Sequence, residues 1–171
     1  QVDDIGKLVE EFGTFARMPS ANFVRMNLNT VIMTQYSLFK QNTKDIKMLY
    51  SPSDSSKISI LIDPQQIRQA LTNLFQNSID SIHENLDKSQ GQINIFTKKY
   101  KNRLYLIVED NGLGFPEEKE TLTNPYVTLR SNGTGLGLSI VQRIMEEHNG
   151  KLILENTKNG GAKVKLEFII T

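Results

Sequence analysis

The sequence predicts an α/β two-layer sandwich, in which one mixed, mostly antiparallel sheet is covered on one face by helices. Segments with helical apolar spacing alternate with short segments rich in β-branched and aromatic residues. Two pairs of these strands are separated only by short turns, at residues 100–102 and 158–161. A length of 171 residues with 38% hydrophobic residues is enough for a single core.

A first helix is predicted over residues 2–17, where apolar residues recur at spacings of three, four and three. The Met-Pro-Ser sequence at 18–20 ends it. This apolar seam has no evident partner in the sequence, so it either docks on the domain or forms half of a helical hairpin, and we favour the hairpin. The seam consists of Ile5, Leu8, Phe12 and Phe15.

The next elements are a helix over residues 28–41, with a mixed apolar face, and two strands over 45–50 and 57–62. The strands are separated by the turn-rich sequence Ser-Pro-Ser-Asp-Ser-Ser.

A long helix is predicted to begin after Asp63 and to run to about Leu86. Asp63 can cap it, Pro64 suits the first helical position, and Gln66 completes a capping box. Its inward-facing residues are Ile67, Leu71, Leu74, Phe75, Ser78 and Ile82.

The second half of the chain is predicted to contain one helix and further strands. The helix covers residues 135–148 and ends at the sequence Asn-Gly. Residues 111–133 are rich in Gly, Pro, Asn and Thr, and such a long loop in a compact domain is usually functional. The strands cover 91–99, 103–109, 151–156 and 162–170.

Composition narrows the class of function. The net charge of +1, from 20 basic and 19 acidic residues, gives no electrostatic reason to expect nucleic acid or an anionic membrane surface as partner. The absence of cysteine excludes disulfides and thiol chemistry. No apolar run approaches the ~18 residues of a spanning helix, and no signal peptide is recognisable. Because the sequence begins with Gln1 rather than Met, we interpret it as a segment of a longer protein.

A glycine-rich stretch, Gly-Thr-Gly-Leu-Gly-Leu-Ser at 133–139, precedes the last helix. Glycine lets a ligand approach main-chain N–H groups, and a helix N-terminus offers unpaired donors and a positive dipole end, so a phosphate suits this loop. It is not a dinucleotide fingerprint, because Leu138 stands where the third glycine belongs, and the sequence has no P-loop. A turn that merely caps the helix is the alternative.

Polar residues gather on one flank of the long helix. Asn73, Asn77 and Asp80 fall within about 60° of one another and away from the apolar centre. Asparagine is not favoured inside helices, so the group is unusual, although a solvated helix face is the alternative.

A third motif, Asp-Asn-Gly-Leu-Gly at 110–114, follows a strand. Gly112 and Gly114 permit a sharp turn and close approach of a flat ligand, and the Asp110 carboxylate can accept a hydrogen bond from an amino group such as that of adenine. The alternative is an ordinary turn at a strand end. In the long loop, Arg130 offers a fork of donors for phosphate oxygens, or is a solvated charge.

The order of these motifs resembles the histidine-kinase branch of the GHKL ATPases over residues 57–170. Residues 73–78 match the N box, 110–114 the G1 box, 125–128 the F box and 133–138 the G2 box. The resemblance implies the Bergerat ATPase fold with a short leading helix.

The resemblance narrows to nitrogen-regulation sensor kinases of the NtrY/NtrB type, through residues 11–19 and through Tyr-Val-Thr at 126–128 followed by Arg130. It implies that residues 1–19 are the second helix of a dimerisation and phosphoacceptor hairpin and that 20–171 form the catalytic, ATP-binding domain. The phosphorylated histidine would lie on the first helix, because the sequence has no H-E-x-x-x-P stretch. We interpret His83 and His148 as surface histidines.

The resemblance also implies residue roles. Asn77 would supply an oxygen to Mg²⁺, and Asn73 would lie beside the phosphates. Hydrolysing relatives of the gyrase and Hsp90 type carry a glutamate base at the position of Asn73, so asparagine favours phosphoryl transfer over hydrolysis. Asp110 would bind the adenine amino group, with Gly112 and Gly114 beside the base. Residues 115–132 would form a lid, and the other nucleotide-binding residues would be Asp80, Thr128, Gly133, Thr134, Gly135, Leu136, Gly137 and Leu138.

Two positions depart from the common pattern. Asp80 stands where many sensor kinases carry a basic residue, although related nitrogen sensors tolerate an acid there. Asn132 stands where lysine is frequent in this group, so the charge for the γ-phosphate would come from Arg130 or from outside this chain.

The resemblance implies a sensor histidine kinase that uses ATP and Mg²⁺ to phosphorylate a histidine outside this chain, for relay to an aspartate of a response regulator. The parent would be a homodimer anchored in the inner membrane, with this domain in the cytoplasm and without contact to nucleic acid or membrane. Two alternatives stay open: a self-contained ATPase, and a non-enzymatic nucleotide-gated interaction module that uses the apolar seam.

Overall fold

The computed structural model describes residues 5–6, 9, 12–13, 16–52, 58–85, 90–128 and 133–171. A five-stranded sheet has the order β2-β4-β5-β7-β6, in which β2 pairs with β4 in parallel and the other neighbours are antiparallel. Its strands are β2 (Ile46–Ser51), β4 (Gly91–Tyr100), β5 (Arg103–Asp110), β6 (Lys151–Asn156) and β7 (Ala162–Ile169).

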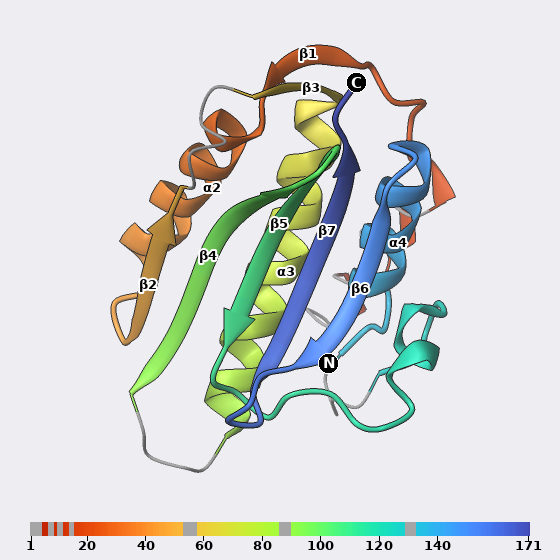
Figure 1. Cartoon of the computed structure of the whole chain (residues 1–171). Helices are drawn as coiled ribbons and strands as arrows, with labels where there is room; N and C mark the ends of the chain where they lie inside the picture. The colour runs from red at the N-terminus through yellow and green to blue at the C-terminus, as the bar shows by residue number, and fades with distance from the viewer. Residues whose placement is uncertain are drawn as a thin grey trace.

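Helices α2 (Leu28–Asn42), α3 (Pro64–Glu84) and α4 (Gly137–Glu147) cover one face of this sheet, as Figure 1 shows. The core lies between the two layers because the helices turn their apolar sides toward the sheet. The predicted two-layer sandwich is therefore confirmed. Its fully buried large side chains include Phe75, Ile67 and Leu71 of α3 and Ile93, Ile95 and Leu104 of the sheet.

One strand was not predicted from the sequence. β1 (Val24–Asn27) pairs antiparallel with β3 (Ser59–Ile62) in a separate two-stranded ribbon. The segment is short, carries a single β-branched residue and runs directly into α2, so it has no turn signal of its own. Its partner strand also comes more than thirty residues later, and only the folded chain brings the two together.

The start of α3 lies where it was predicted, with Asp63 as the N-cap and Pro64 in the first turn. Asp63 Oδ1 accepts hydrogen bonds from the backbone N–H groups of Gln65 at 2.8 Å and Gln66 at 3.1 Å. Burial raises the pKa of Asp63, but the backbone donors of Asn22, Gln66 and Gln65 outweigh it and hold that pKa below its ordinary value.

The predicted capping box is wrong in one of its two bonds, because the Gln66 side chain does not accept from the backbone N–H of Asp63. The backbone N–H of Asp63 donates to His148 Nε2 at 3.0 Å, whereas the Gln66 amide donates to Glu147 Oε2 at 2.8 Å. The reason is tertiary, because α3 and α4 pack together and bring stronger acceptors from the end of α4 to this helix start.

His148 is also not the surface residue that was predicted. It is 8% exposed, and Nδ1 lies 2.7 Å from the carbonyl oxygen of Ile144. Its ring packs edge-on against Phe23 at 5.0 Å and Phe168 at 6.3 Å between ring centroids. Burial lowers the pKa of His148 and favours the neutral ring that its two hydrogen bonds require. His83, in contrast, is exposed as predicted.

The described residues before the domain, at 5–6, 9, 12–13 and 16, are helical. Ile5, Val9 and Phe12 are 64%, 63% and 49% exposed, so these apolar side chains of the predicted helix are not packed on the domain. Leu8 and Phe15 of the predicted seam lie outside the described residues. Among the helices in the described part of the chain, none is long and apolar enough to cross a membrane.

Candidate functional site

A cavity of about 690 Å³ lies between α3, the end of β5, the short 3-10 helix η2 (Lys119–Thr123) and the start of α4. This volume is within the range of pockets that hold small molecules. The cavity brings together motifs that are separated by up to sixty residues in the sequence. Of the predicted site residues, its lining includes Asn73, Asn77, Asp80, Asp110, Gly114, Thr128, Gly133, Thr134, Gly135, Gly137 and Leu138.

Two asparagines of α3 face the first residue of α4. A Cβ atom at Gly137 would lie 3.5 Å from Asn77 Nδ2 and 3.9 Å from Asn73 Oδ1. Asn73 Nδ2 is buried and has no hydrogen-bond partner among the described residues. A buried donor without a partner costs about 1–3 kcal/mol, so such groups are rare unless a ligand satisfies them.

The start of α4 forms the opposite wall. Its N-cap residue is Leu136, whose side chain makes no capping bond. Thr134 Oγ1 accepts a hydrogen bond from the backbone N–H of Leu136 itself at 3.4 Å. The Ser139 hydroxyl donates back to the Leu136 carbonyl, and so does not cap the first turn. The first N–H groups of a helix have no intrahelical partner and carry the positive end of the helix dipole, so this wall suits an anion.

Gly135 shapes the loop that leads into α4. Its φ is +71°, and a Cβ atom there would lie 2.5 Å from the backbone carbon of Tyr126. Tyr126 also donates from its backbone N–H to the Gly135 carbonyl at 3.0 Å. A larger residue at 135 would therefore be strained and would separate the loop from the segment that carries Val127 and Thr128.

The far end of the cavity holds Asp110, which is 7% exposed. Its Oδ1 accepts hydrogen bonds from the backbone N–H groups of Gly112 at 2.9 Å and Ala162 at 3.2 Å. These two bonds hold the carboxylate in one orientation at the cavity wall. Gly112 does not line the cavity, and its missing side chain instead lets the loop pack against Ser81 of α3.

The remaining predicted site residues do not all present a side chain to the cavity. The side chain of Leu136 is fully buried in the core, so only its backbone is available to a ligand. The Asp80 carboxylate accepts a hydrogen bond from Gln76 Nε2 at 2.7 Å. Arg130 and Asn132 lie outside the described residues. In the part of the chain that the structure describes, no group of three or more His, Cys, Asp or Glu residues could hold a metal ion.

Two residues of the cavity that come from β7 were not predicted from the sequence. They are Ala162 and Val164, which form an apolar part of the lining beside Asp110. Leu122 and Val127 also line the cavity and come from the segment that was predicted as a lid. β7 reaches the site only because it pairs with β5, where Val164 lies opposite Val108. Nothing in the local sequence of β7 marks these residues as part of a pocket.

Comparisons with known proteins agree with this arrangement. The chain belongs to the family described as histidine kinase-, DNA gyrase B-, and HSP90-like ATPase, whose model matches residues 62–170. The matched region contains α3, α4 and every described wall of the cavity. The family predicted from the boxes is therefore confirmed.

Curated relatives include a nitrogen regulation protein and sensor histidine kinases that are described as similar to it. The chain is 34% identical to nitrogen regulation protein NtrY of Azorhizobium caulinodans over 170 residues, covering 97% of this chain and 22% of NtrY. It is 37% identical to a putative NtrY-like sensor histidine kinase of Rickettsia bellii over 168 residues, covering 97% and 27%. The chain thus spans about a quarter of the length of these relatives.

Solved structures give the same result. The catalytic domain of histidine kinase ThkA, in a nucleotide-free form, is 32% identical with a TM-score of 0.77, covering 88% of this chain and 97% of that domain. ThkA in complex with the response regulator protein TrrA is 28% identical with a TM-score of 0.81, covering 99% and 48%. The chain is therefore similar to the catalytic domain of a histidine kinase over 88% of its length.

Proposed function

We propose that this domain binds ATP with Mg²⁺ in the cavity and transfers the γ-phosphoryl group to a histidine that lies outside the chain. One observation carries the proposal. The start of α4, whose N-cap residue Leu136 has no capping side chain, faces Asn77 and the buried, unsatisfied Nδ2 of Asn73 at a cavity of nucleotide size. This arrangement offers N–H donors to an anion from two sides.

The donors present fit ATP. The first N–H groups of α4, with the loop at Gly133, Thr134 and Gly135, would bind the phosphates. The fixed carboxylate of Asp110 would accept a hydrogen bond from the adenine amino group, between the apolar side chains of Ala162 and Val164.

Only a few protein oxygens are needed for the metal. Mg²⁺ is usually held by one or two protein oxygens together with phosphates and water, so the amide oxygen of Asn77 suffices as its protein ligand. When bound, Mg²⁺ neutralises charge on the phosphate oxygens. Asp80 lies one turn further along the cavity wall, and Arg130 remains a candidate for the γ-phosphate.

Transfer is favoured over hydrolysis. A neutral asparagine amide cannot remove a proton from water, so Asn73 cannot act as the base of an ATPase. Phosphoryl transfer, in contrast, requires mainly positioning and neutralisation of charge, which backbone donors and asparagine amides provide. Names of relatives that are sensor histidine kinases support the same conclusion.

We further propose that residues 1–19 belong to the hairpin that carries the phosphoacceptor, and that 20–171 form the catalytic domain. The exposed apolar residues Ile5, Val9 and Phe12 support this division, because they would be covered by the missing first helix or by a second copy in a homodimer. A response regulator is the expected acceptor, since ThkA was solved in complex with one. We infer a cytoplasmic location, in a parent anchored in the inner membrane.

The test combines the chain with ATP, Mg²⁺ and a separately produced phosphoacceptor hairpin of the parent. We expect an acid-labile phosphohistidine on the hairpin, and its loss in Asn77→Ala. Asn42→Ala, which changes an exposed residue at the end of α2, is the matched control and should leave transfer unchanged. Steady phosphate release without phosphohistidine would instead favour an ATPase, and nucleotide binding without transfer would favour a nucleotide-gated interaction module.

A further inference from the structure

Residues 18–23, which span the proposed boundary between hairpin and catalytic domain, form a strap across the start of α3 and the end of α4. Met18 is 8% exposed and belongs to the core. The backbone N–H of Asn22 donates to Asp63 Oδ2 at 2.7 Å, and the Phe23 ring packs edge-on against His148. The strap thus contacts both helices that frame the cavity.

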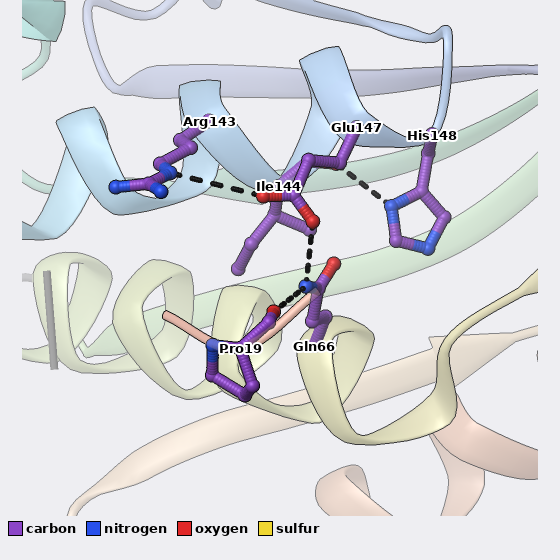
Figure 2. Close-up of polar contacts among 6 residues, drawn as sticks. All are labelled: Pro19, Gln66, Arg143, Ile144, Glu147 and His148. Carbon is purple, nitrogen blue, oxygen red and sulfur yellow. Dashed lines mark hydrogen bonds and ion pairs between the residues drawn. The ribbon is translucent and has the colours of Figure 1, made fainter. Parts of the chain in front are cut away.

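Gln66 joins Pro19 of the strap to Glu147 of α4, as Figure 2 shows. Its Nε2 donates to the carbonyl oxygen of Pro19 at 3.2 Å and to Glu147 Oε2 at 2.8 Å. The other oxygen of Glu147 lies 3.7 Å from Arg143 Nε, one turn earlier on α4. One amide group therefore joins the strap, α3 and α4.

The acceptor side of the same amide is not satisfied. Gln66 is 4% exposed, and its Oε1 is buried with no hydrogen-bond partner in the described part of the chain. An apolar side chain of similar size would avoid this penalty. The two donated bonds are therefore what the glutamine contributes here. Glu147 needs such a donor, because a carboxylate at a helix C-terminus is unfavourable beside the negative end of the helix dipole.

We propose that Gln66 is a positioning residue that latches the strap to the α3–α4 pair and so fixes the direction in which the leading helical residues leave the ATP-binding domain. α3 carries Asn73 and Asn77, and α4 begins at Gly137 on the cavity wall. The latch therefore ties the leading segment to the same two helices that form the proposed phosphate site. The latch itself is independent of the proposed function. Only the statement that α3 and α4 form a phosphate site rests on that function.

The absence of cysteine makes the latch measurable with spin labels. We would place one label at Ala16 and one at Lys158, both exposed, and record the distance distribution by pulsed electron paramagnetic resonance. Gln66→Leu should broaden the distribution at least twofold. Gln142→Leu is the matched control, because Gln142 donates to Glu146 at 2.7 Å on the exposed face of α4 and does not reach the strap.

Two further variants separate latching from simple packing. Gln66→Lys keeps the donors and removes the unsatisfied acceptor, so it should restore a narrow distribution. Glu147→Ala, which removes the acceptor at a partly exposed position, should broaden it even if Gln66→Leu folds poorly. An unchanged width in Gln66→Leu or Glu147→Ala, or a broad one in Gln66→Lys, would overturn the proposal. A wild-type chain that binds no ATP would refute the proposed function and leave the distance result standing.

Discussion

The two ends of the α3–α4 pair differ in how their polar groups are satisfied. At the strap end, Asp63, Glu147 and His148 bind one another's helices or the strap through hydrogen bonds within the chain, and Gln66 Oε1 is the exception without a partner among the described residues. At the cavity end, Asn73 Nδ2 lacks a partner among the described residues, and the N-cap residue of α4, Leu136, has no capping side chain. Most polar groups at the strap end therefore hold the fold, whereas the donors at the cavity end face a space that fits a ligand.

The largest effect is expected from removing the N-cap of α3. Asp63→Ala should lower the free energy of unfolding by about 2–3 kcal/mol, because the carboxylate caps α3 and also holds Asn22 of the strap. Denaturant titration measures this. Asn27→Ala, which removes the side chain that accepts from the backbone N–H of Asn29 at the start of α2, should cost only about 1 kcal/mol. Equal losses would show that the strap contributes nothing.

A substitution at the cavity end should raise the free energy of unfolding instead of lowering it. Asn73→Leu removes the buried donor without a partner, so the free energy of unfolding should rise by about 1 kcal/mol while affinity for ATP falls about tenfold. Calorimetry and denaturant titration measure the two effects. Gln65→Leu, at an exposed position of α3 outside the cavity, should change neither. A destabilised Asn73→Leu would mean that the amide serves the fold rather than a ligand.

As the pH decreases, the free energy of unfolding should fall first through protonation of His148, which lies at the strap end. Burial lowers the pKa of His148, so below its ordinary value near 6.5 the unfolded chain binds a proton that the folded chain does not. Unfolding free energy should therefore fall as the pH drops through 6.5, by at most about 1.4 kcal/mol per pH unit, until the lowered pKa is reached. The hydrogen bond to the Ile144 carbonyl, and after it the negative charges of Asp63 and Glu147, oppose this lowering of the His148 pKa.

Two histidine variants test whether this pH dependence of stability comes from His148. His148→Gln should flatten it between pH 7.5 and 5.5 in thermal unfolding, while His83→Gln, at the exposed histidine that pairs with Asp45, should retain it. A slope that survives in His148→Gln would assign the dependence to another group.

The smallest effect is expected far from both ends. Lys163 Nζ and Glu109 Oε1 lie 2.8 Å apart between paired residues of β7 and β5, and both side chains remain about a quarter exposed. A double-mutant cycle of Lys163→Met and Glu109→Gln should give a coupling of about 0.2–1 kcal/mol that decreases with salt. A larger value would show that stability is not concentrated at the strap end.

Much of the fold was predictable from local pattern. The helix after Asp63, the hairpin of β4 and β5 and the helix after Gly135 carry clear periodicity and turn residues, and their observed bounds lie within about two residues of those predicted. The side chains at Asn73, Asn77 and Asp110 could also be selected, because asparagines are not favoured inside helices and because the order of the three motifs resembles a known family.

The rest depended on packing between segments that are distant in sequence. Pairing of β1 with β3, burial of His148, the contribution of Ala162 to the cavity and the three-way bond of Gln66 have no local signal. A hydrogen bond is short and directional, so its partner is known only when the segments are placed in space. The chain thus specifies its helices, strands and family by pattern, and its latch and cavity walls by tertiary contacts.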